Sequence, residues 1–339
     1  MFRTISIALV GSVVGYLLGI PMGELFGAVI AIVFASHFGC NALLLPKHTI
    51  VFIQTVLGMS VGSVVSFGVI TEQFNPVLLV ALISCLAIQT MSAYLWLRKR
   101  EGWSDIDSFL GAIPGALAAI LSMGDKYANA SPKVIFAHSV RLIILVTTAA
   151  IVSYFTSSNI AETTSNPNWT LNVGIVLLIV SLLSLTFGRL ASKVGIPAPY
   201  MVMALLVSVV AKEVLPQGGF IVPTVLVSLS TMALGAFLGL RLTEVAIEHV
   251  MSYVRAGVLV TFISLSVTVL FSYVMSIVTG VEWIVLLLSW VPGNVEAMTA
   301  VALMLGLEPA FVMINHVVRL GVLHTLPLFF RRFLIQQKQ

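Results

Sequence analysis

Long apolar stretches, separated by short polar connections, run through almost the whole chain. A helix that crosses the hydrocarbon core of a bilayer needs about 17 to 25 mainly apolar residues. Stretches of this length predict ten membrane-spanning helices and therefore an all-α polytopic membrane protein. They lie at roughly 4–20, 24–41, 49–70, 76–97, 133–155, 170–191, 198–215, 220–241, 255–279 and 310–330.

Two further apolar stretches, near 105–124 and 283–306, contain a Pro-Gly pair close to the middle. Proline removes a backbone N–H donor and interrupts a helix, so both stretches predict a broken segment. A His-x-x-Arg motif begins 24 positions after each of these prolines, and residues three apart share a helix face. The two copies consist of Pro114, Gly115, His138 and Arg141, and of Pro292, Gly293, His316 and Arg319.

The two copies belong to a longer internal repeat. Pro21 and Pro197 are 176 positions apart, and the two Pro-Gly pairs are 178 positions apart. Between them, a Gly-x-x-x-Gly sequence that begins at Gly58 recurs 177 positions later. Glycines four apart line one face of a helix and let a second helix approach closely. We therefore predict two membrane repeats, residues 1–165 and 166–339.

The positions of lysine and arginine indicate whether the Pro-Gly segments cross the membrane. If both cross, giving 12 spans in parallel repeats, nine of these residues face the cytoplasm and six face outward. If each segment enters and leaves on the same side, 14 lie inside and one lies outside, which agrees far better with the positive-inside rule. This second arrangement is a re-entrant segment plus five spans per repeat, an odd number, so the repeats would be inverted. Both chain ends would then be cytoplasmic.

Hydrophobic residues make up 59% of the chain and charged residues 9%, with a mean hydropathy of +1.10. Soluble domains carry about 25% charged residues, so this composition points to the lipid bilayer as the surroundings. The net charge of +4 comes from short connections and the C-terminal end, which argues against a nucleic-acid partner. The sequence shows no nucleotide-binding loop, hydrolase elbow, dinucleotide fingerprint or metal-ligand spacing, so we expect no cofactor and no metal.

Arg141 and Arg319 are the central candidate site residues, because an ionisable side chain inside a membrane is costly and usually functional. In one interpretation they form a site for an anion or a carboxylate, together with the half-helix ends at the breaks. In the other, each arginine satisfies carbonyls that the neighbouring break has freed, or extends its charged end to the membrane interface. His138 and His316 either carry a proton coupled to solute movement or pack as histidines bonded to a carbonyl.

Polar residues beside the second break extend the candidate site. Glu296 is the one carboxylate close to a Pro-Gly pair, and Ala118 occupies the equivalent position in the first repeat. It either neutralises Arg319 or binds a proton or cation in one half of the protein only. Asn294 adds an amide next to it. The small-residue helix faces suggest a homodimer, although they could equally pack within one chain.

The duplicated order of a Gly-x-Pro turn, a Gly-x-x-x-Gly helix, a Pro-Gly break and a helix with an x-x-Arg signature resembles the bacterial AbrB duplication family. The resemblance covers nearly the whole chain. The sequence departs from the family's Pro-Gly-Gly at the third position, where it has Ala116 and Asn294. The resemblance implies a multi-pass protein of the bacterial inner membrane. The family labels imply either regulation of gene expression or an ammonia monooxygenase.

The residues themselves favour a secondary transporter or permease-like protein for a small anionic solute, with its site between the repeats. Coupling to protons or cations is part of this hypothesis. The alternative is an AbrB-type membrane regulator or sensor that affects gene expression. A membrane monooxygenase is the third hypothesis and the least favoured, since the sequence offers no redox-metal site, and we expect the protein not to be an enzyme.

Overall fold

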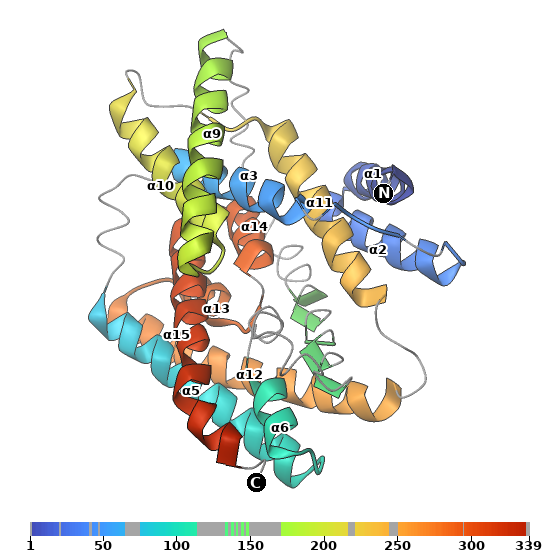
Figure 1. The fold of residues 1–339 in the computed structure, drawn as a ribbon, viewed down its shortest axis with the longest axis vertical. Coiled ribbons are helices and arrows are strands. Elements are labelled where there is room, and N and C mark those ends of the chain that lie inside the picture. Colours follow the sequence, from blue (N-terminus) through green and yellow to red (C-terminus); the bar gives the residue numbers. More distant parts are fainter. Residues whose placement is uncertain are drawn as a thin grey trace. The chain divides into compact units, whose positions relative to one another are not determined.

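The computed structural model describes residues 2–19, 22–40, 43–46, 48–64, 75–113, 171–215, 221–243, 250–293 and 295–336, and part of 133–148. Every regular element within these residues is an α-helix (Figure 1). Among the described residues, three helices are long and apolar enough to cross a bilayer, at Pro76–Lys99, Gly174–Val194 and Tyr253–Thr279. These observations agree with the predicted class of all-α membrane protein.

Nine of the ten predicted spans coincide with one helix each. The tenth, predicted at 133–155, is helical wherever it is described, up to residue 148. The nine are α1 (Phe2–Leu17), α2 (Gly23–His37), α3 (Thr49–Val64), α5 (Pro76–Lys99), α9 (Leu171–Val194), α10 (Pro199–Val214), α11 (Thr224–Thr243), α12 (Val250–Thr279) and α15 (Pro309–Gln336).

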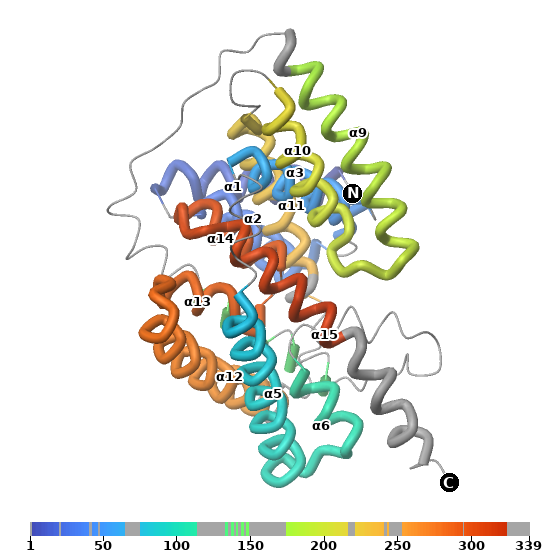
Figure 2. The backbone as a smooth tube through the Cα atoms, turned by 90° about the vertical axis from the view of Figure 1, so that its left-hand side faces the viewer, coloured from blue at the N-terminus to red at the C-terminus, as the bar shows by residue number. Residues whose placement is uncertain are grey.

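The chain divides into two compact units, and each draws segments from both predicted repeats. The first unit contains Met1–Gln73, Thr148–Glu244 and Thr299–Phe311, and the second contains Phe74–Thr147, Val245–Met298 and Val312–Gln339. In the first unit α3 packs against α10, and α2 packs against α11. In the second unit α5 lies beside α12 (Figure 2). The predicted repeat boundary at residue 165 lies outside the described residues.

Glycines bring α3 and α10 into backbone contact in the first unit. A Cβ atom added to Gly58 would lie 2.3 Å from the carbonyl oxygen of Met201. A Cβ added to Gly62 would lie 2.5 Å from that of Leu205. No larger side chain fits at such distances without a backbone shift. Since higher residue numbers on α3 meet higher residue numbers on α10, the two helices run in the same direction.

The second Gly-x-x-x-Gly pair makes the equivalent contact between α11 and α2. A Cβ added to Gly235 would lie 2.3 Å from the carbonyl oxygen of Leu25, and one added to Gly239 would lie 2.9 Å from the Cβ atom of Ile32. These two helices also run in the same direction. The prediction that both glycine pairs permit close helix approach is confirmed. Because the partner helices belong to the same chain, these faces no longer argue for a homodimer.

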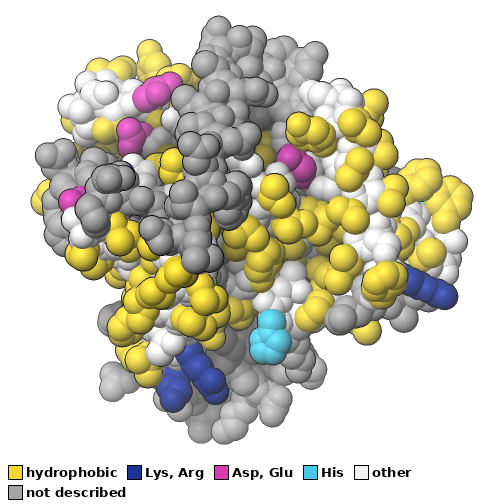
Figure 3. All heavy atoms as spheres, turned by 90° about the horizontal axis from the view of Figure 1, so that it is seen from above, with side chains coloured by type: hydrophobic (Ala, Val, Ile, Leu, Met, Phe, Trp, Pro, Cys, Tyr) yellow, Lys and Arg dark blue, Asp and Glu magenta, His cyan; other side chains and the backbone are white. Residues whose placement is uncertain are grey.

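Apolar side chains also cover much of the protein surface. On the face shown in Figure 3 they far outnumber charged side chains. Helix α12 alone exposes Phe262, Leu270 and Ile277, with more than 60% of each residue accessible. A soluble protein rarely exposes apolar surface on this scale, whereas lipid tails cover it without cost. This surface supports the membrane assignment.

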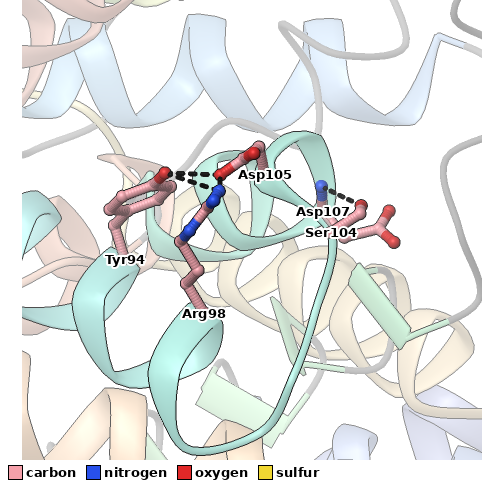
Figure 4. Close-up of polar contacts among 5 residues, drawn as sticks. All are labelled: Tyr94, Arg98, Ser104, Asp105 and Asp107. Atoms are coloured by element: carbon pink, nitrogen blue, oxygen red, sulfur yellow. Dashed lines mark hydrogen bonds and ion pairs between the residues drawn. The ribbon is translucent and has the colours of Figure 1, made fainter.

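The turn between α5 and α6 (Asp105–Ala112) is held by polar contacts in the second unit (Figure 4). Arg98 forms an ion pair with Asp105, whose Oδ1 also accepts a hydrogen bond of 2.7 Å from the hydroxyl of Tyr94. The hydroxyl of Ser104 accepts a bond of 3.1 Å from the backbone N–H of Asp107 and so caps the start of α6. These contacts determine where the first broken segment begins.

Both broken segments contain helices that are too short to cross a membrane. Helix α6 ends at Ala112, directly before the first Pro-Gly pair, which lies outside the described residues. In the second segment α13 (Trp283–Trp290) stops before Pro292, and α14 (Val295–Leu305) follows. At 1.5 Å per residue, an eight-residue helix is about 12 Å long, less than half of the hydrocarbon core. The predicted break is confirmed in the second copy.

Candidate functional site

Proline at each break leaves one particular carbonyl without its helical partner. In a continuous helix, the N–H of residue i bonds to the carbonyl of residue i−4. Because Pro114 and Pro292 have no N–H, the carbonyls of Leu110 and Leu288 lose that donor. Both carbonyls lie in the last turn of a short helix; Leu288 is buried and Leu110 is partly buried. Each therefore needs another donor.

The two motif histidines supply this donor. The Nε2 atom of His138 lies 3.0 Å from the carbonyl oxygen of Leu110, and that of His316 lies 2.9 Å from the carbonyl oxygen of Leu288. A carbonyl only accepts, so Nε2 must carry the hydrogen in both rings. In the neutral ring, Nδ1 is then left with a lone pair. For His316, no described residue donates to Nδ1.

The two motif arginines satisfy the carbonyls that follow. Arg141 donates from its NH1 to the carbonyl oxygen of Ile113 at 3.2 Å, and from its NH2 to that of Gly111 at 2.8 Å. Arg319 donates from NH1 to Val291 and from NH2 to Gly293. A cation at a helix C-terminus is also favoured by the helix dipole. Each His-x-x-Arg motif is thus a cap for the half-helix before its Pro-Gly pair.

These contacts correspond to the structural interpretation of the arginines and histidines. The arginines bond to carbonyls at helix C-termini, and the anion-site hypothesis had placed them near freed N–H groups and helix N-termini. The hypothesis and the structure differ because the His-x-x-Arg side chains contact the C-terminal end of the half-helix before each break, not the N-terminal end of the segment after it. The capping bonds do not use every donor of the arginines. A guanidinium has five N–H groups, and these bonds involve only its NH1 and NH2 nitrogens.

The guanidinium groups keep unused donors in a buried environment. Only 2% of Arg141 and 1% of Arg319 is accessible. Within the part of the chain that the structure describes, neither Nε atom has a hydrogen-bond partner. A buried cation is costly, and a bound anion would reduce that cost.

The remaining predicted site residues lie beside the second break or outside the described residues. Glu296 lies in the first turn of α14, where the helix dipole favours a negative charge, and it is 6% accessible. Gly293 contributes the carbonyl that Arg319 binds, and Pro292 causes the break. Asn294, Pro114 and Gly115 lie outside the described residues.

Sequence reasoning missed a polar network beside the second break. Gln89 Nε2 donates to Thr268 Oγ1 at 2.6 Å and makes a long contact of 3.5 Å with the carbonyl oxygen of Trp290. The indole N–H of Trp290 in turn donates to Asn315 Oδ1 at 3.2 Å. A usable signal was present, because Gln89 is an amide in the middle of an otherwise apolar predicted span.

Among the described residues, no three side chains of His, Cys, Asp or Glu lie together in a way that could hold a metal ion. Cys40 and Cys85 are both free thiols, the first exposed and the second buried.

Comparison with known proteins places this geometry in a family. The profile of the family described as transition state regulatory protein AbrB matches residues 25–334, which include both breaks and both His-x-x-Arg caps. A protein of Bacillus subtilis (strain 168), named uncharacterized protein YhjN, is 23% identical over 358 aligned positions. That alignment covers 96% of this chain and 91% of the other protein. The family match extends over most of the chain, so this helical membrane protein belongs to the AbrB family, as its duplicated motifs predicted.

Proposed function

We propose that this protein is a secondary transporter or permease-like protein of the bacterial inner membrane that moves a small anionic solute. The observation that carries the proposal is the pair of buried arginines at the breaks. Each caps a broken half-helix, and each keeps a buried Nε donor that has no partner among the described residues. Charged groups in a membrane interior usually mark a solute or ion pathway.

The helix directions in the first unit support inverted repeats. As successive membrane spans, α2 and α3 run in opposite directions, because the short connection between them stays on one side of the bilayer. Helix α10 runs parallel to α3 and is therefore antiparallel to α2. Since α10 is the repeat counterpart of α2, the counterparts point in opposite directions. This is the relation that an inverted repeat requires, and parallel repeats would not produce it.

The same arrangement gives the solute site its chemistry. Two repeats, residues 1–165 and 166–339, each contribute one broken segment and one capping arginine. The arginines would bind the solute's negative charge through the N–H groups that the caps leave over. His316 Nδ1 would accept a hydrogen bond from the solute, and a proton bound there would turn it into a donor. His138, His316 and Glu296 are thus the groups through which protons or cations could couple to transport.

The arginines can be tested by transport assays on the purified full chain in liposomes. Solid-supported membrane recordings would measure charge movement with acetate, glycolate, sulfate, phosphate and succinate as probes. We expect Arg319→Gln to reduce flux at least about tenfold, because a buried hydrogen bond to a charged group contributes about 1.5 to 3 kcal/mol. Arg319→Lys, which keeps the charge and the cap donors but loses Nε, should also reduce flux.

Arg255→Gln is the matched control, since this arginine is exposed on α12. It should transport as the wild type does. Size-exclusion elution in detergent establishes that each variant is folded. Normal flux in folded Arg319→Gln would rule out the proposed site, and a wild type that moves none of the five anions would rule out the solute class.

A membrane regulator is a second candidate, favoured by the description of the family as a transition state regulatory protein. In that case the same site would bind its anion without transporting it. A stable complex with a soluble regulatory protein, isolated from cells together with an absence of flux in liposomes, would favour this function. Transport by the purified protein alone would count against it.

A further inference from the structure

The amide of Gln89 has a determined orientation. Thr268 has one hydroxyl hydrogen, which it donates to the backbone carbonyl of Ser264 at 2.8 Å. Thr268 Oγ1 must therefore accept from Gln89, and the group at 2.6 Å must be the amide nitrogen. The second neighbour, the carbonyl oxygen of Trp290, is also an acceptor. Both acceptors, Thr268 Oγ1 and the Trp290 carbonyl oxygen, face Nε2, so the amide oxygen points away from them.

That oxygen lacks a donor. Gln89 is 1% accessible, and among the described residues none donates to its Oε1. An unsatisfied buried acceptor costs about 1 to 3 kcal/mol, and native proteins rarely retain one without a reason. A methionine or leucine at this position would fill the space without that cost. The missing partner is therefore a donor that the described part of the chain does not provide.

The amide lies next to the second capped break. Its nitrogen contacts the carbonyl of Trp290, and Arg319 binds the carbonyl of the next residue, Val291. The thiol of Cys85 lies 3.2 Å from Gln89 Nε2. Gln89 and Arg319 therefore contact the carbonyls of adjacent residues, directly before Pro292 in the second unit.

We propose that Gln89 Oε1 receives an N–H or O–H group of the transported anion and thereby selects anions that carry a hydrogen-bond donor. This inference rests on the proposed transport function and specifies its substrate class. An oxyanion with its own hydroxyl, such as hydrogen phosphate or a hydroxy acid, pairs with both the arginine and the amide. A fully deprotonated oxyanion, such as sulfate or acetate, leaves the amide oxygen unpaired or turns two acceptors toward each other.

Matched anion pairs test this selection by equilibrium binding of radiolabelled probes to the purified full chain. The pairs are phosphate with sulfate, and glycolate with acetate. In the wild type we expect the donor-bearing member of each pair to bind at least about tenfold more tightly, as one satisfied buried acceptor allows. In Gln89→Met, both ratios should fall to near one. Thr268→Val, which removes the anchor of the amide, should lower them less.

Gln54→Met is the matched control, because it makes the same change at another buried glutamine, in the first unit. Its ratios should equal those of the wild type. A wild type that binds both members equally, or a Gln89→Met variant that keeps the preference, would overturn the inference and leave the transport proposal standing. A wild type that binds none of the four probes would overturn both the inference and the transport proposal. If Gln54→Met also loses the preference for donor-bearing anions, the inference is overturned, because the effect would not be specific to Gln89.

Discussion

The two Pro-Gly breaks carry the same His-x-x-Arg cap, but their surroundings differ. Arg141 binds two carbonyls that precede its proline, whereas Arg319 binds one on each side of Pro292. The second copy also has larger or polar side chains where the first has alanine. The three pairs, each 178 positions apart, are Ala112 and Trp290, Ala118 and Glu296, and Ala137 and Asn315.

The first glycine of each Gly-x-x-x-Gly pair, in the first unit, makes the same contact in both repeats. Gly58 and Gly235 make the same close approach, each with a Cβ position 2.3 Å from a carbonyl oxygen of the neighbouring helix. This glycine contact is therefore alike in both repeats, whereas larger or polar side chains replace three alanines around the second break. Under the proposed function, the caps are structural in both copies and the second copy supplies the solute-specific groups.

Removing either cap should have the largest effect and should affect both copies similarly. Arg141→Met and Arg319→Met each leave two buried carbonyls without a side-chain donor. We expect each variant to lose about 2 to 6 kcal/mol of unfolding free energy, at about 1 to 3 kcal/mol for each carbonyl. Denaturant titration in detergent micelles measures this loss. Arg189→Met, at an exposed position on α9, is the control, and a cap variant that matched it would contradict the structural role.

Overfilling the glycine contacts should destabilise both halves of the first unit equally. Gly58→Leu and Gly235→Leu each place side-chain atoms where a backbone carbonyl now lies. Overpacking of this kind costs about 1 to 3 kcal/mol. Thermal unfolding of the detergent-solubilised protein would show the two losses. Gly174→Leu has open space around its Cβ and should behave as the wild type, while a marked difference between Gly58→Leu and Gly235→Leu would break the symmetry argument.

The polar additions around the second break should have the smallest effect on stability. Asn315→Ala removes the acceptor of the Trp290 indole N–H and should cost about 1 kcal/mol. Tryptophan emission of the folded protein would report the changed environment. In a Trp290→Phe background the same substitution should cost clearly less, because the hydrogen bond is already absent. Equal costs in the two backgrounds would show that Asn315 acts through other contacts.

Much of the architecture follows from local sequence alone. Each apolar stretch is selected by the bilayer independently of its neighbours, so length and hydropathy were enough to locate α5, α9 and α12 within a few residues. Proline removes a donor wherever it occurs, so the break before α14 was also predictable. The regular spacing of the two copies revealed the duplication and, with it, the family.

The contacts at the breaks were decided only by the tertiary structure. His316 lies 28 positions after the carbonyl it satisfies, and Gln89 lies 179 positions before the threonine that orients it. No local periodicity reports partners at such separations, because side chains on one helix constrain only neighbours three or four residues away. The sequence determined that arginines and histidines are buried beside two helix breaks. The packing of the helices determined that they cap helix C-termini, and that the amide oxygen of Gln89 has no donor among the described residues.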